Sequence, residues 1–216
     1  MLDPANLPAR RGTLQSLPLC VIEAVFSINS RYEATDNTVQ RFCQAVNIPW
    51  RGPQRRPPIA DQFSTVDLLQ LYSQHTAQHL AVHVYGNEQM TSSRNGILKS
   101  EAVRQFAEAC RRFNLDYLQD FDVVRDFAQF EAAIQQIRGQ RSGVSVRYFY
   151  MLAGDDNFVK PDRMVRRFVQ SAIGRWPTVQ EAHDGVVGAQ ELLVHRYPHL
   201  APKLLDNLIW RYQRVH

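Results

Sequence analysis

Apolar residues recur every three or four positions along most of the chain, and this helical period is the feature that most limits the fold. The run that contains Val103, Phe106, Cys110 and Phe113 shows it clearly. The segment Pro18–Ser30 is apolar nearly all round, as a buried central helix would be. Because no credible pair of alternating segments appears, the sequence predicts an all-α fold without a strand pair.

Polar residues mark where several of the expected helices begin. Ser64 with Asp67 resembles a capping box and predicts a long helix that continues as far as Gly86. Thr178 with Glu181 forms a second capping box ahead of a helix near the C-terminus. The 216 residues are 44% hydrophobic and 21% charged, so we expect a folded chain of one large domain or two small lobes.

Arginine dominates the basic residues of the chain. Of the 25 lysines and arginines only three are lysines, and the formal net charge is +4 at pH 7. Arginine binds phosphate through paired hydrogen bonds, so this bias favours a polyanionic partner, although codon usage in a high-GC genome explains it equally well. Arg51, Arg55 and Arg56 fall in the proline-rich segment 48–59, which we expect to be an exposed basic loop.

The spacing of cysteine and histidine argues against a disulfide framework and against a metal site. The cysteines are far apart and follow no Cys-x-x-Cys pattern, so we expect three reduced, buried thiols: Cys20, Cys43 and Cys110. His75, His79 and His83 are four residues apart, and each such step turns about 40° round an α-helix. We therefore expect an ordinary surface there, with no metal and no cofactor.

The sequence shows no targeting or membrane segment. The first seventeen residues lack the apolar core of a signal peptide, and uncharged apolar residues never run together over the length that a membrane span needs. We therefore expect a cytoplasmic protein that does not enter a membrane.

The most informative stretch is 137–168, where a glycine-containing turn is followed by an apolar helix, a polar turn and an aspartate that opens a basic helix. Gly139 and Gly143 flank the turn, and Asp162 lies nineteen residues after Gly143. This arrangement resembles the helix-hairpin-helix (HhH-GPD) DNA glycosylases, the endonuclease III-like superfamily. In that family the hairpin offers backbone N–H groups to a DNA phosphate, and the aspartate faces a flipped nucleotide.

Two further stretches are similar to the same family. Residues 24–30 resemble its early helix, whose end carries Leu-Ser-Gln, and residues 97–102 resemble its Lys-Ala helix. The resemblance covers roughly residues 18–174, with the three stretches in the family order. It implies a two-lobed bundle, with residues 1–34 and 151–216 in one lobe and residues 35–150, ending in the hairpin, in the other.

The activity that the resemblance implies is that of a monofunctional DNA glycosylase. The enzyme would bind double-stranded DNA as a monomer, extrude a nucleotide and hydrolyse its N-glycosidic bond, with Asp162 stabilising the cationic sugar or orienting the attacking water. The ordinary interpretation of Asp162 is that it caps a helix. A DNA-binding module that has kept the scaffold without the activity, and a helical protein-interaction domain, are the competing interpretations.

The chain departs from the family pattern in three places. The residue two after Gly139 is Arg141, so the hairpin is not Gly-x-Gly. No lysine lies between Lys99 and Lys160, so we expect no lyase step through a Schiff base. No cysteine follows Cys110, so we expect no iron–sulfur cluster.

The resemblance also assigns two groups of DNA contacts. Around the hairpin we expect backbone amides, guanidinium groups and hydroxyl groups to bind phosphate, from Arg138, Gly139, Arg141, Ser142, Gly143, Ser145 and Arg147. At the end of the early helix, Asn29 takes the place of the glutamine that fills the hole left by a flipped base, and Arg31 and Tyr32 follow it. A solvated charged turn and a simple C-cap by Asn29 are the structural alternatives.

Overall fold

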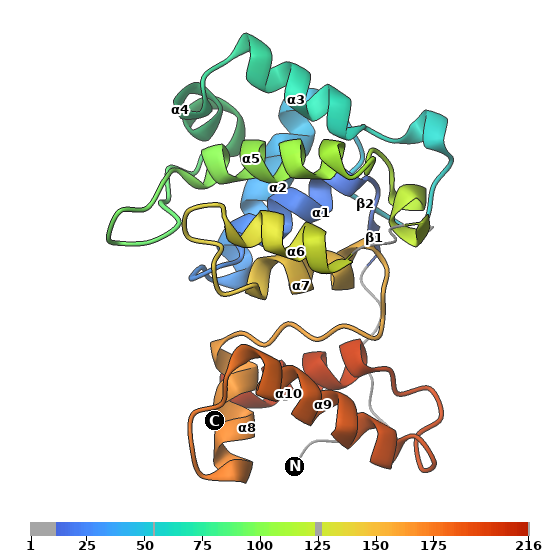
Figure 1. The fold of residues 1–216 in the computed structure, drawn as a ribbon. Coiled ribbons are helices and arrows are strands. Elements are labelled where there is room, and N and C mark those ends of the chain that lie inside the picture. Colours follow the sequence, from blue (N-terminus) through green and yellow to red (C-terminus); the bar gives the residue numbers. More distant parts are fainter. Residues whose placement is uncertain (1–11, 54, 124–126, 216) are drawn as a thin grey trace. The chain divides into compact units, whose positions relative to one another are not determined.

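The computed structural model describes residues 12–53, 55–123 and 127–215, and these form two compact units. The larger unit contains residues 12–153 and the smaller unit residues 154–215. Both are built mainly from helices, which confirms the predicted all-α class (Figure 1). In the described residues, no helix is both long enough and apolar enough to cross a membrane.

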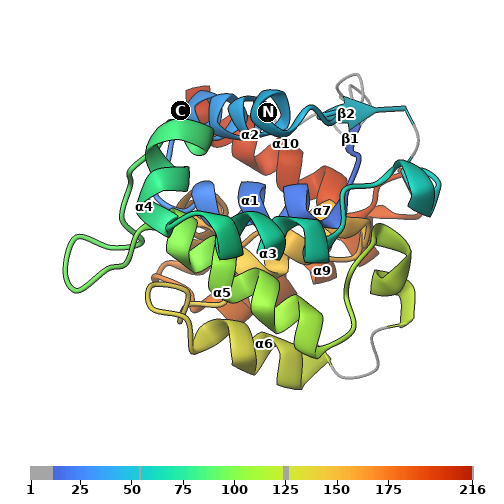
Figure 2. The ribbon, with the colours of Figure 1, turned by 90° about the horizontal axis from the view of Figure 1, so that it is seen from above.

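The larger unit is organised round a helix that is buried along its whole length. This helix, α1 (Leu17–Phe26), packs against α7, α5 and α2, and Figure 2 shows it between α2 and α5. In chain order the elements are β1 (Thr13–Leu14), α1, α2 (Tyr32–Val46), β2 (Arg51–Gly52), η1 (Ile59–Asp61), α3 (Thr65–Gln74), α4 (Ala77–Leu80), η2 (Ala81–Tyr85), α5 (Lys99–Arg112), η3 (Leu118–Val123), α6 (Phe127–Gln135) and α7 (Val144–Ala153). The prediction of a buried central helix is confirmed.

The smaller unit is made of three helices that pack on one another. They are α8 (Arg163–Ile173), α9 (Val179–Leu193) and α10 (Pro202–Val215). Its core is aliphatic, and includes Val165, Val169, Val186, Leu205 and Ile209. The strongly one-sided distribution of apolar residues in α8 buries Val165 and Val169 and leaves the arginines on the outer face.

The division between the units differs from the expected one. Residues 12–34 were expected beside the C-terminal helices, but the structure groups them with the larger unit. The physical reason is that α1 is apolar on every side and is covered by helices from residues 32–153. Residues 1–11 lie outside the described residues.

The capping boxes predicted from the sequence are confirmed. The Ser64 hydroxyl accepts a hydrogen bond from the Asp67 amide at 3.1 Å, and the Asp67 carboxylate accepts one from the Ser64 amide at 2.8 Å. Thr178 and Glu181 exchange the same pair of bonds at 3.1 and 2.8 Å. Both helices therefore begin where their side chains satisfy the first backbone amides.

The single long helix expected as far as Gly86 is wrong. The first helix, α3, ends at His75, whose backbone is extended, and Thr76 starts the next by accepting a hydrogen bond from the His79 amide at 3.1 Å. The chain then completes a π turn, η2, and stops at Gly86 in the left-handed conformation. A second N-cap inside a continuous apolar pattern was the missed signal.

The structure also contains a strand pair that the sequence analysis did not expect. Thr13 pairs with Gly52 and Leu14 with Arg51 in an antiparallel arrangement. Each strand has only two residues, too few to show any alternation in the sequence. The buried thiols are confirmed, because Cys20, Cys43 and Cys110 are all inside and none is joined in a disulfide.

Candidate nucleic-acid interface and acidic site

The predicted hairpin lies between α6 and α7, and its two glycines have the backbone conformation that only glycine adopts easily. Gly139 has a φ of 89° and Gly143 a φ of 74°. The turn is closed by hydrogen bonds from the Gln140 amide to the Ile137 carbonyl and from the Gly143 amide to the Gln140 carbonyl. A Cβ on Gly139 would lie 2.4 Å from Cβ of Thr91, so close packing also requires glycine there.

The side chains round this hairpin fall into two groups. Arg138, Arg141 and Ser142 are exposed, whereas Gln140 and Ser145 are 2% and 1% exposed. The amide group of Gln140 and the hydroxyl of Ser145 have no hydrogen-bond partner among the described residues. Such orphaned groups are uncommon, because leaving a buried polar atom without a partner costs about 1–3 kcal/mol.

Arg147 differs from the exposed arginines of the hairpin. Its side chain is 13% exposed and lies 3.6 Å from the Glu131 carboxylate of α6. The guanidinium is therefore engaged within the larger unit. It is the member of the expected phosphate-binding group that contributes most clearly to packing and charge balance.

The loop after α1 carries the second group of predicted DNA contacts. Asn29 has a left-handed backbone, with a φ of 52°, and Arg31 is exposed at the start of α2. The loop is held from inside by Lys99, whose Nζ donates to the carbonyl oxygens of Phe26 at 3.0 Å and Ile28 at 2.7 Å. A buried ammonium thus satisfies the carbonyl of the last residue of α1 and that of Ile28, and it fixes the path of the chain before Asn29.

Tyr32, the third residue of this group, is half-buried at the first position of α2.

A third loop, residues 87–98, belongs to the same side of the larger unit. Figure 1 shows it beside the loops that follow α1 and α6. Thr91 packs on Gly139, and the Gln89 side chain accepts a hydrogen bond from Lys99 Nζ at 2.9 Å. The three loops are therefore joined by these contacts, and we call residues 27–31, 87–98 and 138–143 together the loop edge.

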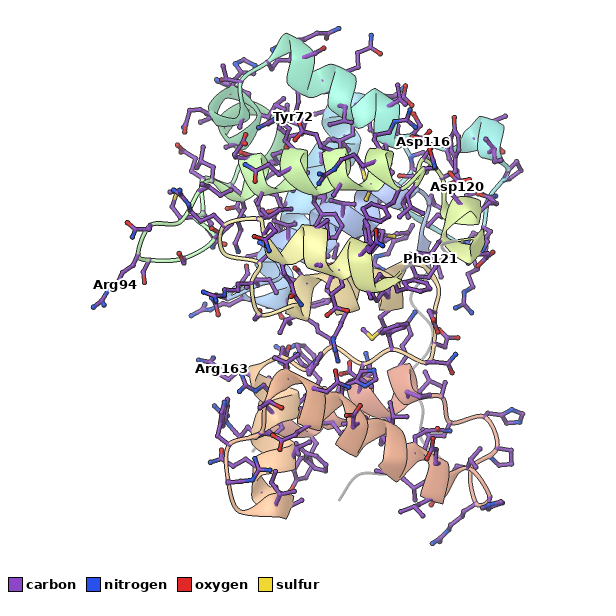
Figure 3. The ribbon with its side chains drawn as sticks, viewed as in Figure 1. Tyr72, Arg94, Asp116, Asp120, Phe121 and Arg163 are labelled. Carbon is purple, nitrogen blue, oxygen red and sulfur yellow. The ribbon has the colours of Figure 1, made fainter. Side chains whose placement is uncertain are left out.

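The tip of loop 87–98 carries a further cation on the loop edge. Arg94 is exposed and points outward from the loop (Figure 3). The following residue, Asn95, has a φ of 54°, and the Ser92 hydroxyl donates to the Arg94 carbonyl at 2.7 Å. The signal in the sequence was the short polar run that ends at Gly96, which marks a tight turn but gives no direction to its side chains.

The expected exposed basic loop 48–59 is wrong for its first arginine. Arg51 Nη2 lies 2.9 Å from the Glu23 carboxylate, and Tyr148 donates its hydroxyl proton to the same carboxylate at 2.7 Å. Burial and the Glu23 charge together raise the Tyr148 pKa well above its ordinary value. These three residues, which we call the Glu23 cluster, join α1, β2 and α7 inside the unit.

Asp162 lies in the smaller unit and is the N-cap of the eleven-residue helix α8. Its Oδ1 accepts hydrogen bonds from the Met164 amide at 2.8 Å and the Val165 amide at 3.2 Å. The predicted capping role is confirmed. No described residue donates to the other oxygen, Oδ2, so half of this carboxylate has no donor.

The approach to Asp162 is constrained as well. The Asp162 amide donates to the Lys160 carbonyl at 2.7 Å, and the Lys160 amide donates to Oδ1 of Asp206 at 3.3 Å. Asp206 belongs to α10 and is 6% exposed. Its burial, and next the charge of Asp162, raise the Asp206 pKa well above its ordinary value.

Cations surround the start of α8 without pairing with Asp162. Arg163 is exposed at the first position of the helix, as Figure 3 shows, and Arg167 is exposed one turn later. Arg166 instead donates to the Pro177 carbonyl and lies 4.7 Å from the centre of the Trp176 ring. The outer face of α8 is therefore positive, as attraction to a polyanion requires.

The rings of the three histidines follow one another along the surface. The ring centres of His75 and His79, and those of His79 and His83, are 4.6 Å apart. His75 ends α3, His79 lies in α4 and His83 in η2, so the three do not share one α-helix. Within the described ranges, no three histidine, cysteine or acidic side chains converge on a point that could hold a metal ion.

The comparisons with known proteins identify a family but no activity. A family model described as a domain of unknown function, DUF8548, matches residues 1–214. No curated protein and no solved structure matches the chain.

Proposed function

The chain belongs to the DUF8548 family, and from its own residues we propose that it is a monofunctional DNA N-glycosylase. It would act on double-stranded DNA as a monomer in the cytoplasm, associated with the nucleoid. The substrate would be a nucleotide extruded from the duplex, and the reaction would be hydrolysis of the bond between base and sugar.

The observation that carries this proposal is the state of Asp162. One carboxylate oxygen is held by two backbone amides at a helix N-terminus, and the other receives no hydrogen bond from the described residues. The helix dipole favours the anion by about 0.3–1 kcal/mol. An oriented carboxylate with one available oxygen suits the stabilisation of a cationic sugar or the orientation of a water molecule.

The loop edge supports the proposed DNA partner. It combines the exposed side chains of Arg94, Arg138 and Arg141 with the exposed Gly139, where the lack of a side chain lets the backbone come close to a phosphate. The hairpin leads directly into the ten-residue helix α7, whose first amides have no partner within the helix. Binding through such contacts releases counterions and weakens as salt rises.

The lysines support hydrolysis rather than a lyase reaction. Lys99 is buried and donates to three acceptors, and Lys203 pairs with Asp156 at 3.4 Å. Lys160 is the remaining lysine, and its backbone is part of the turn before Asp162. We therefore expect an abasic product whose strand stays intact until alkali or heat is applied, and no adduct that borohydride can trap.

The second candidate is a non-catalytic DNA-binding module. Its specific support is that capping of α8 already gives Asp162 a structural role. This candidate predicts the same salt-dependent binding by the loop edge, without any release of base.

The decisive experiment is base release from duplexes that carry a panel of modified bases, comparing the parental protein with Asp162→Asn. Asparagine caps helices about as well as aspartate, so the thermal unfolding midpoint should stay the same. The rate should fall by about 10²–10³-fold, because the charge that stabilises the transition state is lost.

A matched control is Asp184→Asn, which removes an exposed carboxylate from α9 in the same unit. It should leave the rate unchanged. Binding without base release by the parental protein on every duplex would support the DNA-binding module, and parental turnover by Asp162→Asn would refute the proposed role of Asp162.

A further inference from the structure

The segment that leads to Asp162 is held by the first turns of α10. The Lys203 amide donates to the Asp156 carbonyl at 3.0 Å, and the Lys203 ammonium lies 3.4 Å from the Asp156 carboxylate. One turn further along α10, Asp206 accepts a hydrogen bond from the Lys160 amide. Both ends of segment 156–160 are therefore attached to the same helix.

Asp206 and Asp162 use their carboxyl groups in the same way. In each, Oδ1 accepts hydrogen bonds from backbone amides. In each, Oδ2 receives none from the part of the chain that the structure describes. Asp206 is the more deeply buried of the two, and both attach to the turn that runs from Lys160 to Asp162.

We propose that Asp206 is a positioning residue for Asp162: it anchors the turn through the Lys160 amide and keeps the site at a single negative charge. This inference rests on the glycosylase function proposed above and adds a means of regulation to it. Asp206 would not touch the substrate; it would act through the orientation and the charge of Asp162.

Burial is the main reason that Asp206 favours its neutral form, and the charges that face it modify this preference. Asp162 at the start of α8 repels a second anion, while Lys160 in the turn and Lys203 on α10 attract one more weakly. Burial disfavours the anion most, so the pKa of Asp206 is raised well above its ordinary value. A neutral Asp206 can still accept the Lys160 hydrogen bond. When pH rises far enough to ionise it, two like charges face each other across the turn.

The variants Asp206→Asn and Asp206→Ala separate these two contributions. Asparagine keeps an oxygen that accepts from the Lys160 amide and cannot ionise, so the maximal rate should stay within about twofold of parental, and the decline that ionisation of Asp206 causes as pH rises should disappear. Alanine removes the anchor, and displacement of Asp162 should lower the rate by about 10–100-fold. Asn207→Ala, an exposed position on the same helix, is the matched control and should change neither quantity.

The same variants give a readout that does not depend on base release. In the full chain, carbon-13 NMR of the carboxyl groups should show Asp206 titrating above the ordinary pH of an aspartate. Asp206→Ala should shift the amide signals of Lys160 and Asp162, because the anchor is lost, whereas Asp206→Asn should shift them much less. An Asp206 that titrates at its ordinary pH, or amide signals unchanged by Asp206→Ala, would overturn the inference. Failure of the glycosylase proposal alone would remove base release and leave both NMR results as expected.

Discussion

The Glu23 cluster and the Asp162–Asp206 pair place acidic side chains in opposite situations. Glu23 is buried, and its carboxylate is matched by the guanidinium of Arg51 and the hydroxyl of Tyr148. Asp162 is partly accessible, and one of its oxygens has no donor within the described residues. A carboxylate whose oxygens are both engaged stabilises the fold, whereas one with an available oxygen can act on a ligand.

The largest expected effect is a loss of stability in Glu23→Ala, which tests whether the Glu23 cluster stabilises the fold. Glu23→Ala removes the anion and leaves the Arg51 guanidinium, which is 18% exposed, without its nearest partner. Breaking a buried ion pair from one side costs about 3–5 kcal/mol, so the free energy of unfolding in urea should fall by that order.

Two further variants show whether charge balance is the cause. Glu23→Gln keeps a hydrogen-bond acceptor for Tyr148 and should cost less than Glu23→Ala. The double variant Glu23→Leu with Arg51→Met should recover much of the lost stability, because both charges are removed together. If Glu23→Ala unfolds at the parental urea concentration, the cluster does not stabilise the fold.

A smaller loss of stability is expected at the hairpin. Gly139→Ala introduces a Cβ into a left-handed position and within 2.4 Å of Thr91. Left-handed backbone costs a non-glycine residue about 1–2 kcal/mol before the clash is added. Thermal unfolding should show this decrease, and DNA affinity should fall with it because the loop must change shape.

Gly188→Ala is the control for Gly139→Ala. A Cβ on Gly188 in α9 meets no atom within 4 Å, and alanine favours a helix more than glycine does. The control should therefore be neutral or slightly stabilising. Equal behaviour of the two variants would show that the hairpin has no special conformational requirement.

The cations of the loop edge should affect binding more than stability. Arg141→Ala and Arg94→Ala each remove an exposed guanidinium, so each should weaken DNA binding for all sequences and lower the slope of log K against log salt by about one. Arg104→Ala is the control, since that side chain is paired with Glu101 and Glu108 on α5. Fluorescence anisotropy over a range of salt concentrations measures all three. Unchanged slopes for the first two variants would place the DNA elsewhere or exclude it.

Local signals in the sequence predicted the central helix, several helix starts and the cap at Asp162. Helical periodicity predicted α1. The short polar side chains of Ser64, Thr178 and Asp162, which can hydrogen-bond to nearby backbone amides, predicted three helix starts. Such features depend on residues three or four positions apart, so they can be read along the chain. The glycines of the hairpin are readable for the same reason.

Features that depend on distant partners could not be predicted in this way. Arg51 was expected in solvent, but it pairs with Glu23. The signal in the sequence is that Glu23 is the only charged residue of an apolar helix, because a buried charge needs a partner. The role of Lys99 required knowledge that α5 begins beside the end of α1. Asp206 lies on a C-terminal helix, and its relation to Asp162 follows only from the packing of α10 on α8.

The smallest expected effect concerns stability rather than activity and comes from Asp206. Its pKa in the folded protein is raised above the ordinary value of 3.8, so the folded state holds this proton more strongly than the unfolded state does. The stability that the proton contributes is complete below the ordinary pKa. It is lost as pH rises towards the folded pKa, because the unfolded chain releases the proton first.

Asp206→Asn cannot ionise and escapes this loss, so its unfolding midpoint should match the parental value near pH 4 and exceed it increasingly towards neutral pH. Thermal unfolding of both proteins across this range measures the difference, and a constant difference at all pH values would mean that Asp206 ionises normally, like a carboxyl group with no charged neighbour.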